Sequence, residues 1–143
     1  MTNHDYEHIW GVLALPGSIS GLRAFHYTGR IMERTLDALS LRQRVTAHNV
    51  ANLDTPGYKP FRVTFEDALS EALAAGDRGE QTADFPVRVM RSNGGRVRED
   101  GNGVDIDREM VSVAKTTIAY NAVAQQWSGM YGRMHLAVRE GRR

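Results

Sequence analysis

Large side chains recur at alternating spacings of three and four near the end of the chain, and this pattern constrains the fold more than any other feature of the sequence. It starts at Met110, ends at Val138 and contains no proline. Because it is sustained over about four heptads, it predicts a coiled-coil helix from Asp107 to Glu140, about 50 Å long. The predicted seam consists of Met110, Val113, Thr117, Tyr120, Ala124, Trp127, Tyr131, Met134 and Val138.

A narrower stripe adjoins this seam on the same predicted helix. It consists of Val111, Ala114, Ile118 and Asn121. Asp105 or Asp107 is suited to cap the start of the helix, and Gly141 is suited to cap its end. We therefore expect residues 105–143 to form a C-terminal coiled-coil helix.

A second helical pattern covers residues 28–52, with Thr28 as the expected N-cap. It also carries two stripes, and since a single partner helix covers only one, it needs more than one neighbour. The first stripe holds Met32, Leu36, Leu39, Thr46 and Val50, and the second holds Ala38, Leu41, Val45 and His48. The sequence thus predicts a mainly α fold in which the long N- and C-terminal helices pair as an antiparallel-type coiled coil.

The middle segment, residues 57–104, is predicted to be rich in loops. Thr64 is expected to cap a short helix whose buried face holds Phe65, Leu69 and Leu73 and which ends at Gly76. Alternation at residues 85–89 and the turn-forming pair Asn93-Gly94 before residues 96–98 predict a small β-hairpin.

Residues 1–27 have no sustained period and are expected to form an N-terminal arm. Two interpretations stay open: a flexible arm that orders on assembly, or a start codon placed too early. The apolar run Ile9–Leu15 is far shorter than the roughly 20 residues of a membrane helix. Asp5 and Glu7 stand where a secretion signal carries positive charge, so no cleaved signal peptide is expected.

The sequence offers no residues suited to catalysis, a cofactor or a metal ion. Cysteine is absent, which removes thiolate ligands and a cysteine nucleophile. Residues 98–109 approach the pattern of a calcium loop, but Arg98 stands where an aspartate must bind the ion. The net charge of +1 favours neither a nucleic-acid partner nor an anionic membrane surface. Since the apolar run is also short, we expect no nucleic-acid partner and no direct membrane insertion. We expect neither enzymatic activity nor a cofactor.

The first helix is followed by a specific turn. Asn52 is suited to cap the helix end, and Thr55-Pro56-Gly57-Tyr58 is suited to a type II turn. Proline presets φ at the second turn position, and glycine allows the positive φ of the third. On turn chemistry alone this segment is equally well explained as an ordinary helix ending.

Two motifs resemble the flagellar axial proteins, the rod and hook subunits of bacteria. The first is Leu39–Arg44 with Asn49–Lys59, and its turn residues are Asn49, Asn52, Thr55, Pro56, Gly57 and Tyr58. The second is Asp100–Val111, followed by Ala114 and residues 120–122. Thr-Pro-Gly-Tyr-Lys together with Asp-Gly-Asn-x-Val-Asp is most similar to the proximal rod, or FlgB, type. His48 and Leu53 depart from the family, which usually has small residues there.

The resemblance implies a structural subunit that assembles helically into the flagellar drive shaft and serves motility. Its implied partners are further copies, other rod proteins, the rod base with the MS ring, the type III export apparatus and a rod-cap protein. It implies synthesis in the cytoplasm, export without a cleaved signal, and a place in the basal-body rod across the periplasm. The alternative is a soluble coiled-coil adaptor or export chaperone for axial proteins.

Overall fold

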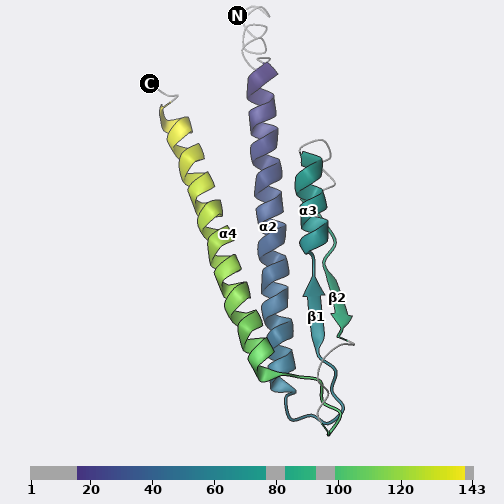
Figure 1. Ribbon diagram of the computed structural model, residues 1–143. Helices are drawn as coiled ribbons and strands as arrows, with labels where there is room; N and C mark the ends of the chain where they lie inside the picture. The colour runs from purple at the N-terminus through teal and green to yellow at the C-terminus, as the bar shows by residue number, and fades with distance from the viewer. Residues whose placement is uncertain (1–15, 77–82, 93–98, 141–143) are drawn as a thin grey trace, which may run out of the picture.

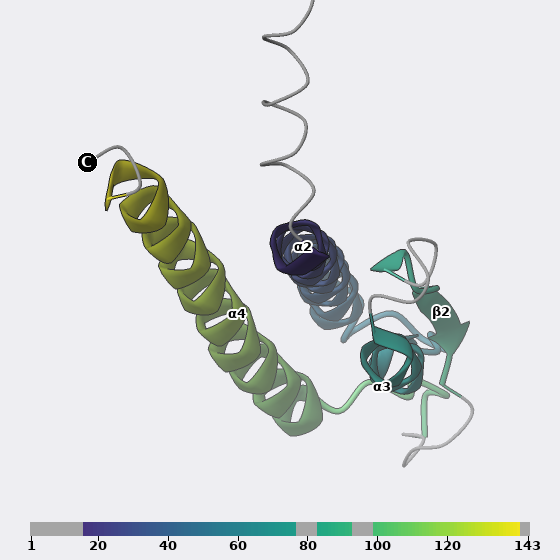
Figure 2. The same ribbon diagram turned by 90° about the horizontal axis from the view of Figure 1, so that it is seen from above.

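The protein is built around one long central helix. The computed structural model describes residues 16–76, 83–92 and 99–140. In chain order these hold α2 (Pro16–Ala51), β1 (Phe61–Thr64), α3 (Glu66–Ala75), β2 (Arg88–Arg91) and α4 (Ile106–Glu140). Helix α4 runs antiparallel to α2 on one side, and the two strands with α3 lie on the other (Figures 1 and 2). The predicted pairing of long N- and C-terminal helices is confirmed.

Helix α2 begins at Pro16, so Thr28 lies inside it and is not its N-cap. Proline is favourable in the first turn of a helix, where its missing N–H is not needed. Gly21 and Gly29 each lower the helical preference by about 1 kcal/mol. Tyr27 and Ile31, on either side of Gly29, are nevertheless buried in the core. Tertiary packing therefore extends the helix into the expected arm, whose first 15 residues lie outside the described part of the chain.

The hydrophobic core lies between α2 and the unit made of β1, α3 and β2. The Tyr27 hydroxyl donates a hydrogen bond to the Ala72 carbonyl, and the rings of Phe65 and Phe85 stack with centroids 6.1 Å apart. The core residues are Tyr27, Ile31, Ala38, Leu39, Val63, Phe65, Ala72, Ala83 and Phe85. Because α4 and this unit cover different sides of α2, the expectation of more than one neighbour is confirmed.

The two strands pair antiparallel, with Phe61 opposite Arg91 and Thr64 opposite Arg88. The expected small antiparallel strand pair in the middle segment is confirmed, but β2 pairs with β1, which precedes α3 in the chain. The predicted turn at Asn93-Gly94 and the strand at residues 96–98 lie outside the described residues.

Helix α3 differs from its prediction in its N-cap and in the last residue of its buried face. Its N-cap is Phe65, without a side-chain capping bond, because Thr64 is still paired in β1. Leu73 is 59% exposed, and Ala72 is the buried residue of that turn. Gly76 closes the helix with φ of +60°, as expected.

Helix α4 turns a different face to α2 than the heptad predicted. Its buried residues are Glu109, Thr116 and Met130, and Ser112, Ala119 and Val123 between them are half-buried. Each lies one position before a seam residue, which is a rotation of about 100° around the helix. The seam residues Met110, Val113, Thr117, Tyr120, Tyr131 and Met134 are exposed, whereas Ala124 and Trp127 are half-buried.

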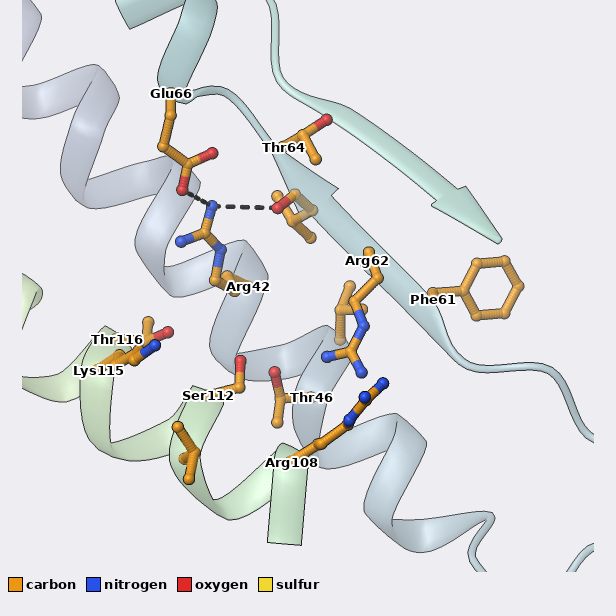
Figure 3. Close-up of a pocket in the computed structure, with 13 residues that line it drawn as sticks. Arg42, Thr46, Phe61, Arg62, Thr64, Glu66, Arg108, Ser112, Lys115 and Thr116 are labelled. Carbon is orange, nitrogen blue, oxygen red and sulfur yellow. Dashed lines mark hydrogen bonds and ion pairs between the residues drawn. The ribbon is translucent and has the colours of Figure 1, made fainter. Parts of the chain in front are cut away.

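Two further features complete the fold. A pocket lies between α2, β1 and the first half of α4 (Figure 3). Within the described segments, no helix is both long and apolar enough to cross a membrane.

Candidate functional site

The turn after α2 has the predicted geometry. The Tyr58 backbone N–H donates to the Thr55 carbonyl at 3.3 Å, and Gly57 has φ of +71°. These are the closing bond and the positive φ of a type II turn. The Asn52 side-chain amide donates to the His48 carbonyl at 2.8 Å, so the predicted cap at the helix end is also confirmed.

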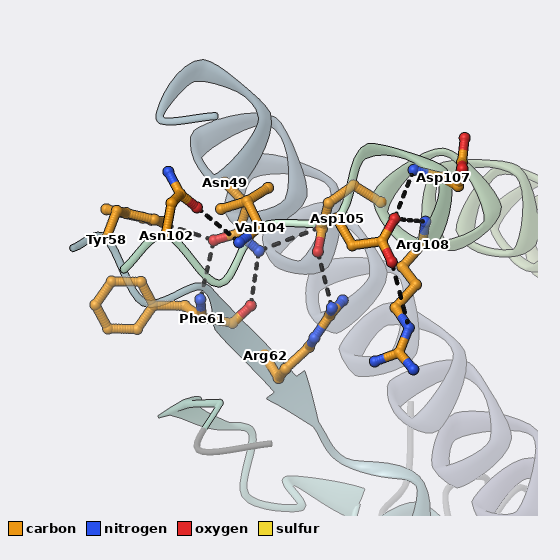
Figure 4. A network of polar contacts seen from close by, with 10 residues as sticks. Asn49, Tyr58, Phe61, Arg62, Asn102, Val104, Asp105, Asp107 and Arg108 are labelled. Carbon is orange, nitrogen blue, oxygen red and sulfur yellow. Dashed lines mark hydrogen bonds and ion pairs between the residues drawn. The ribbon is translucent and has the colours of Figure 1, made fainter. Parts of the chain in front are cut away.

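The two sequence motifs meet in space, and we call the contact between residues 49–62 and 100–109 the motif junction (Figure 4). Asn102 is fully buried at its centre. Its amide nitrogen donates to the carbonyls of Asn52, Leu53 and Thr55 at 3.0, 2.8 and 2.7 Å. Its Oδ1 accepts from the Val104 N–H at 2.7 Å. A residue of the second motif therefore satisfies the carbonyls that end the helix of the first.

Glycines allow the two backbones of the motif junction to touch. The Gly57 N–H donates to the Asp100 carbonyl at 3.0 Å, and the Gly103 N–H donates to the Tyr58 carbonyl at 2.9 Å. A Cβ at Gly101 would lie 3.3 Å from the Gly57 Cα, and Gly101 has φ of +79°. A side chain at Gly101 is thus opposed both by its conformation and by its neighbour.

Asn49 ties the same helix end to β1. Its Oδ1 accepts from the Phe61 N–H at 2.9 Å, and its Nδ2 donates to the Phe61 carbonyl at 2.9 Å. Nδ2 also donates to Glu109 Oε2 at 3.2 Å. One fully buried side chain therefore links α2, β1 and α4.

Glu109 is a carboxylate with no exposed surface. Arg62 Nη2 lies 2.8 Å from its Oε1, at an angle that does not make a hydrogen bond. The interaction between Arg62 and Glu109 is therefore an ion pair. A buried charge left without its partner is strongly destabilising. The first turn of α4 is therefore fixed to both β1 and α2.

His48 and Tyr58 cover the outer side of the motif junction. The Tyr58 hydroxyl donates to Asn49 Oδ1 at 3.2 Å, and His48 Nδ1 lies 2.9 Å from the same hydroxyl. Burial, and then the negative charge of Glu109, raise the pKa of Tyr58, although Arg91 opposes the shift. The hydroxyl therefore stays protonated and available as a donor at neutral pH.

Sequence reasoning found the turn residues but assigned no role to Asn102, Glu109 or Arg62. The available signal was the second motif itself, in which a buried amide and a carboxylate stand seven residues apart beside glycines. Asp105 is the cap of α4, since its Oδ1 accepts from the N–H groups of Asp107 and Arg108. The described ranges contain no group of three side chains placed to hold a metal ion.

Comparison with known proteins gives the same family throughout. The sequence model of the flagella basal body rod protein family matches residues 30–59, the second half of α2 and its turn. The FlgB rod protein of Bacillus subtilis is 29% identical over 126 residues, which cover 82% of this chain and 98% of that protein. That of Borrelia hermsii is 31% identical over 118 residues, covering 70% of this chain and 87% of that protein. The chain belongs to the FlgB family of flagellar basal-body rod proteins. The Escherichia coli member is 26% identical over 128 residues.

Membership of this family identifies the role of the chain. The chain is a structural subunit of the flagellar basal-body rod, and it serves motility as part of that structure. It resides in the basal body and associates with other basal-body proteins. Within this subunit, the motif junction joins the end of α2 to β1 and to the start of α4.

Proposed function

We propose that this chain is a self-assembling subunit of the proximal rod, and that the outward seam of α4 is the surface against which neighbouring axial subunits pack. The residues expected for an assembly seam are Met110, Val113, Thr117, Tyr120, Ala124, Trp127, Tyr131 and Met134 on α4 and Leu36, Leu39 and Val50 on α2. Leu39 lies in the core, and Leu36, Val50, Ala124 and Trp127 are half-buried, so the proposed surface consists of the exposed α4 residues. Packing of subunits through long helices would allow the rod to transmit motor torque.

The observation that carries this proposal is the exposure of large apolar side chains along α4. In the seam, Met110 is 46% exposed, Tyr120 is 36% exposed and Met134 is 40% exposed, and Ile118 of the adjoining stripe is 70% exposed. A heptad seam that faces solvent in one chain is suited to pack into a neighbouring helix. The face used inside the chain carries smaller or polar residues instead, such as Ser112, Thr116 and Ala119.

The motif junction supports the same proposal. Asn49, Asn102 and Glu109 fix the end of α2 to the start of α4, so the direction of α4 is the same in every copy. Many copies can pack identically only if each presents its seam at the same angle.

The test replaces Val113 and Tyr120 by glutamate. Both side chains face solvent in the single chain, so the variant should fold as the wild type does, by circular dichroism and urea unfolding. Charge in an apolar interface should exclude it from basal bodies and abolish swimming in soft agar. Gln125→Glu with Gln126→Glu adds the same charge at exposed positions of the same helix and should swim normally.

Normal swimming of the seam variant, with the subunit present in purified basal bodies, would contradict the assembly role of the seam. Wild-type protein found only in the cytosol would instead favour the adaptor or chaperone alternative.

The proposal also includes an export route and specific neighbours in the basal body. Export by the flagellar type III apparatus without cleavage would place the subunit in the rod across the periplasm, in contact with the rod base, the MS ring and a rod cap. The mass of the subunit taken from basal bodies should then equal its mass in the cytoplasm. A smaller mass in basal bodies would show cleavage and contradict this route.

A further inference from the structure

A pocket with an excess of positive charge lies beside the motif junction. It has a volume of about 430 Å³ and is bounded by α2, β1 and α4 (Figure 3). Its cationic lining residues are Arg42, Arg62, Arg108 and Lys115, and Val45, Val63 and Val111 provide apolar walls.

The excess charge sits on the α4 side of the pocket. Arg42 is paired with Glu66, and Arg62 is paired with Glu109. Among the described residues, the ion-pair partner of Arg108 is the half-exposed Asp105, at 3.8 Å, and the Arg108 side chain is itself 64% exposed. Lys115 adds a second exposed cation one helical heptad further on. Arg108 and Lys115 are therefore available to an incoming acidic group.

Thr116 gives a second, independent indication that something is bound here. It lines the pocket and is 1% exposed, yet its Oγ1 has no hydrogen-bond partner within the described structure. A buried hydroxyl without a partner costs about 1–3 kcal/mol. A carboxylate that entered the pocket could accept this hydroxyl's hydrogen bond.

We propose that this pocket receives the acidic face of α3 from a second copy of the chain, an inference that rests on the proposed self-assembly. Asp67 and Glu71 lie one helical turn apart on α3 and are both exposed. Their charge is complementary to that of Arg108 and Lys115. Glu66 at the start of α3 lines the pocket, but Asp67 and Glu71 do not. The two surfaces are therefore distinct, and the contact between copies is head-to-tail, which generates an open assembly rather than a closed dimer.

Two charge-reversal variants of the full chain test this contact. One carries Arg108→Glu and Lys115→Glu, and the other carries Asp67→Lys and Glu71→Lys. Self-association is measured by sedimentation velocity at low salt over rising protein concentration. The wild type should associate, and each variant alone should associate at least about tenfold more weakly because like charges then meet. An equimolar mixture should recover wild-type association, because each reversed surface then meets one of opposite charge.

Matched controls separate the contact from net charge. Glu33→Lys with Asp37→Lys makes the same change at the same spacing on an exposed part of α2, and Arg133→Glu with Arg139→Glu reverses two exposed positive charges on α4. Both controls should associate as the wild type does. Circular dichroism checks that every variant is folded.

Three results would overturn the contact: a wild type that stays monomeric at low salt, variants that associate normally, or a mixture that does not recover. The last would mean that another acidic segment fills the pocket. The proposed function is tested separately, since a subunit present in basal bodies despite Asp67→Lys and Glu71→Lys would keep the rod role and reject this contact.

Discussion

Two buried asparagines use both ends of their amides at the motif junction. Asn49 donates and accepts with the backbone of Phe61, and Asn102 does the same with the end of α2 and with Val104. Neither side chain has any exposed surface. An aspartate of the same shape lacks the donor, and an alanine lacks both groups, so the asparagine amide is specific to these positions.

Replacing Asn102 by alanine should lower the free energy of unfolding by about 2–3 kcal/mol, because the carbonyls of Asn52, Leu53 and Thr55 lose their donor in a buried site. Urea unfolding followed by circular dichroism measures the loss. Asn121→Ala, at an exposed position of α4, is the matched control and should change stability by less than about 0.5 kcal/mol. Equal effects of the two substitutions would contradict the role given to Asn102.

Replacing glycine by alanine should have opposite effects on stability at the crowded Gly101 and at the open Gly132. Gly101→Ala should destabilise by about 1–2 kcal/mol, since φ is positive and Cβ would press on Gly57. Gly132→Ala lies in α4 with open space around its Cβ and should stabilise by up to about 1 kcal/mol. Thermal unfolding of the pair is the measurement. A neutral Gly101→Ala would mean that the backbones do not touch as described.

At the scale of elements, the sequence predicted that the helices exist better than it predicted which faces they bury. Heptad spacing assigns large apolar residues to the nearest partner, so Met110 and Val113 were expected against α2. The chain instead joins α4 to α2 through a hydrogen bond between Asn49 and Glu109, and Glu109 rather than Met110 is buried. The heptad pattern describes only residues close together in sequence, so it cannot predict a hydrogen bond between Asn49 and Glu109, which are 60 positions apart.

The same limit explains the other differences. Thr64 has the form of a helix cap, but its backbone pairs with Arg88 in β2. Thr28 has the form of a cap as well, but burial of Tyr27 and Ile31 continues the helix through it. The turn at Gly57 was predicted correctly because its geometry depends on adjacent residues alone.

Helix α3 begins at an acid-sensitive contact. Burial would raise the pKa of Glu66, but hydrogen bonds from the Phe65 N–H and from Arg42 outweigh it, so the pKa lies below its ordinary value. Glu66 therefore contributes stability above its unfolded pKa of about 4.3, and this contribution is lost as the pH falls through its lower folded pKa.

We expect Glu66→Gln to remove part of the loss of stability on acidification below about pH 5. Urea midpoints measured from pH 7 to pH 3 would show a flatter curve for this variant than for the wild type. Glu71→Gln removes an equal charge from the same helix without contact to Arg42, and its curve should run parallel to that of the wild type. A Glu66→Gln curve that also runs parallel would refute the contribution.

At the scale of the whole molecule, apolar surface is divided unequally between the two sides of α2. The core lies mainly toward β1, α3 and β2, whereas α4 is joined to α2 through polar and small residues near the motif junction. Further along α4 the contacts with α2 are apolar, through buried Met130 and an edge contact between the rings of Phe25 and Tyr131. Beyond Met130 the described side chains of α4 are exposed, including Tyr131, Met134 and Leu136. Such a chain leaves much of one long helix for its neighbours to cover.

The most direct test of this account is an electron cryomicroscopy map of purified basal bodies in which this subunit is placed. The account predicts that the α4 seam at Met110, Val113 and Tyr120 is buried against a neighbouring axial subunit, with Asn102 still inserted at the end of α2. A rod in which this seam faces solvent while the subunit is fully assembled would contradict it.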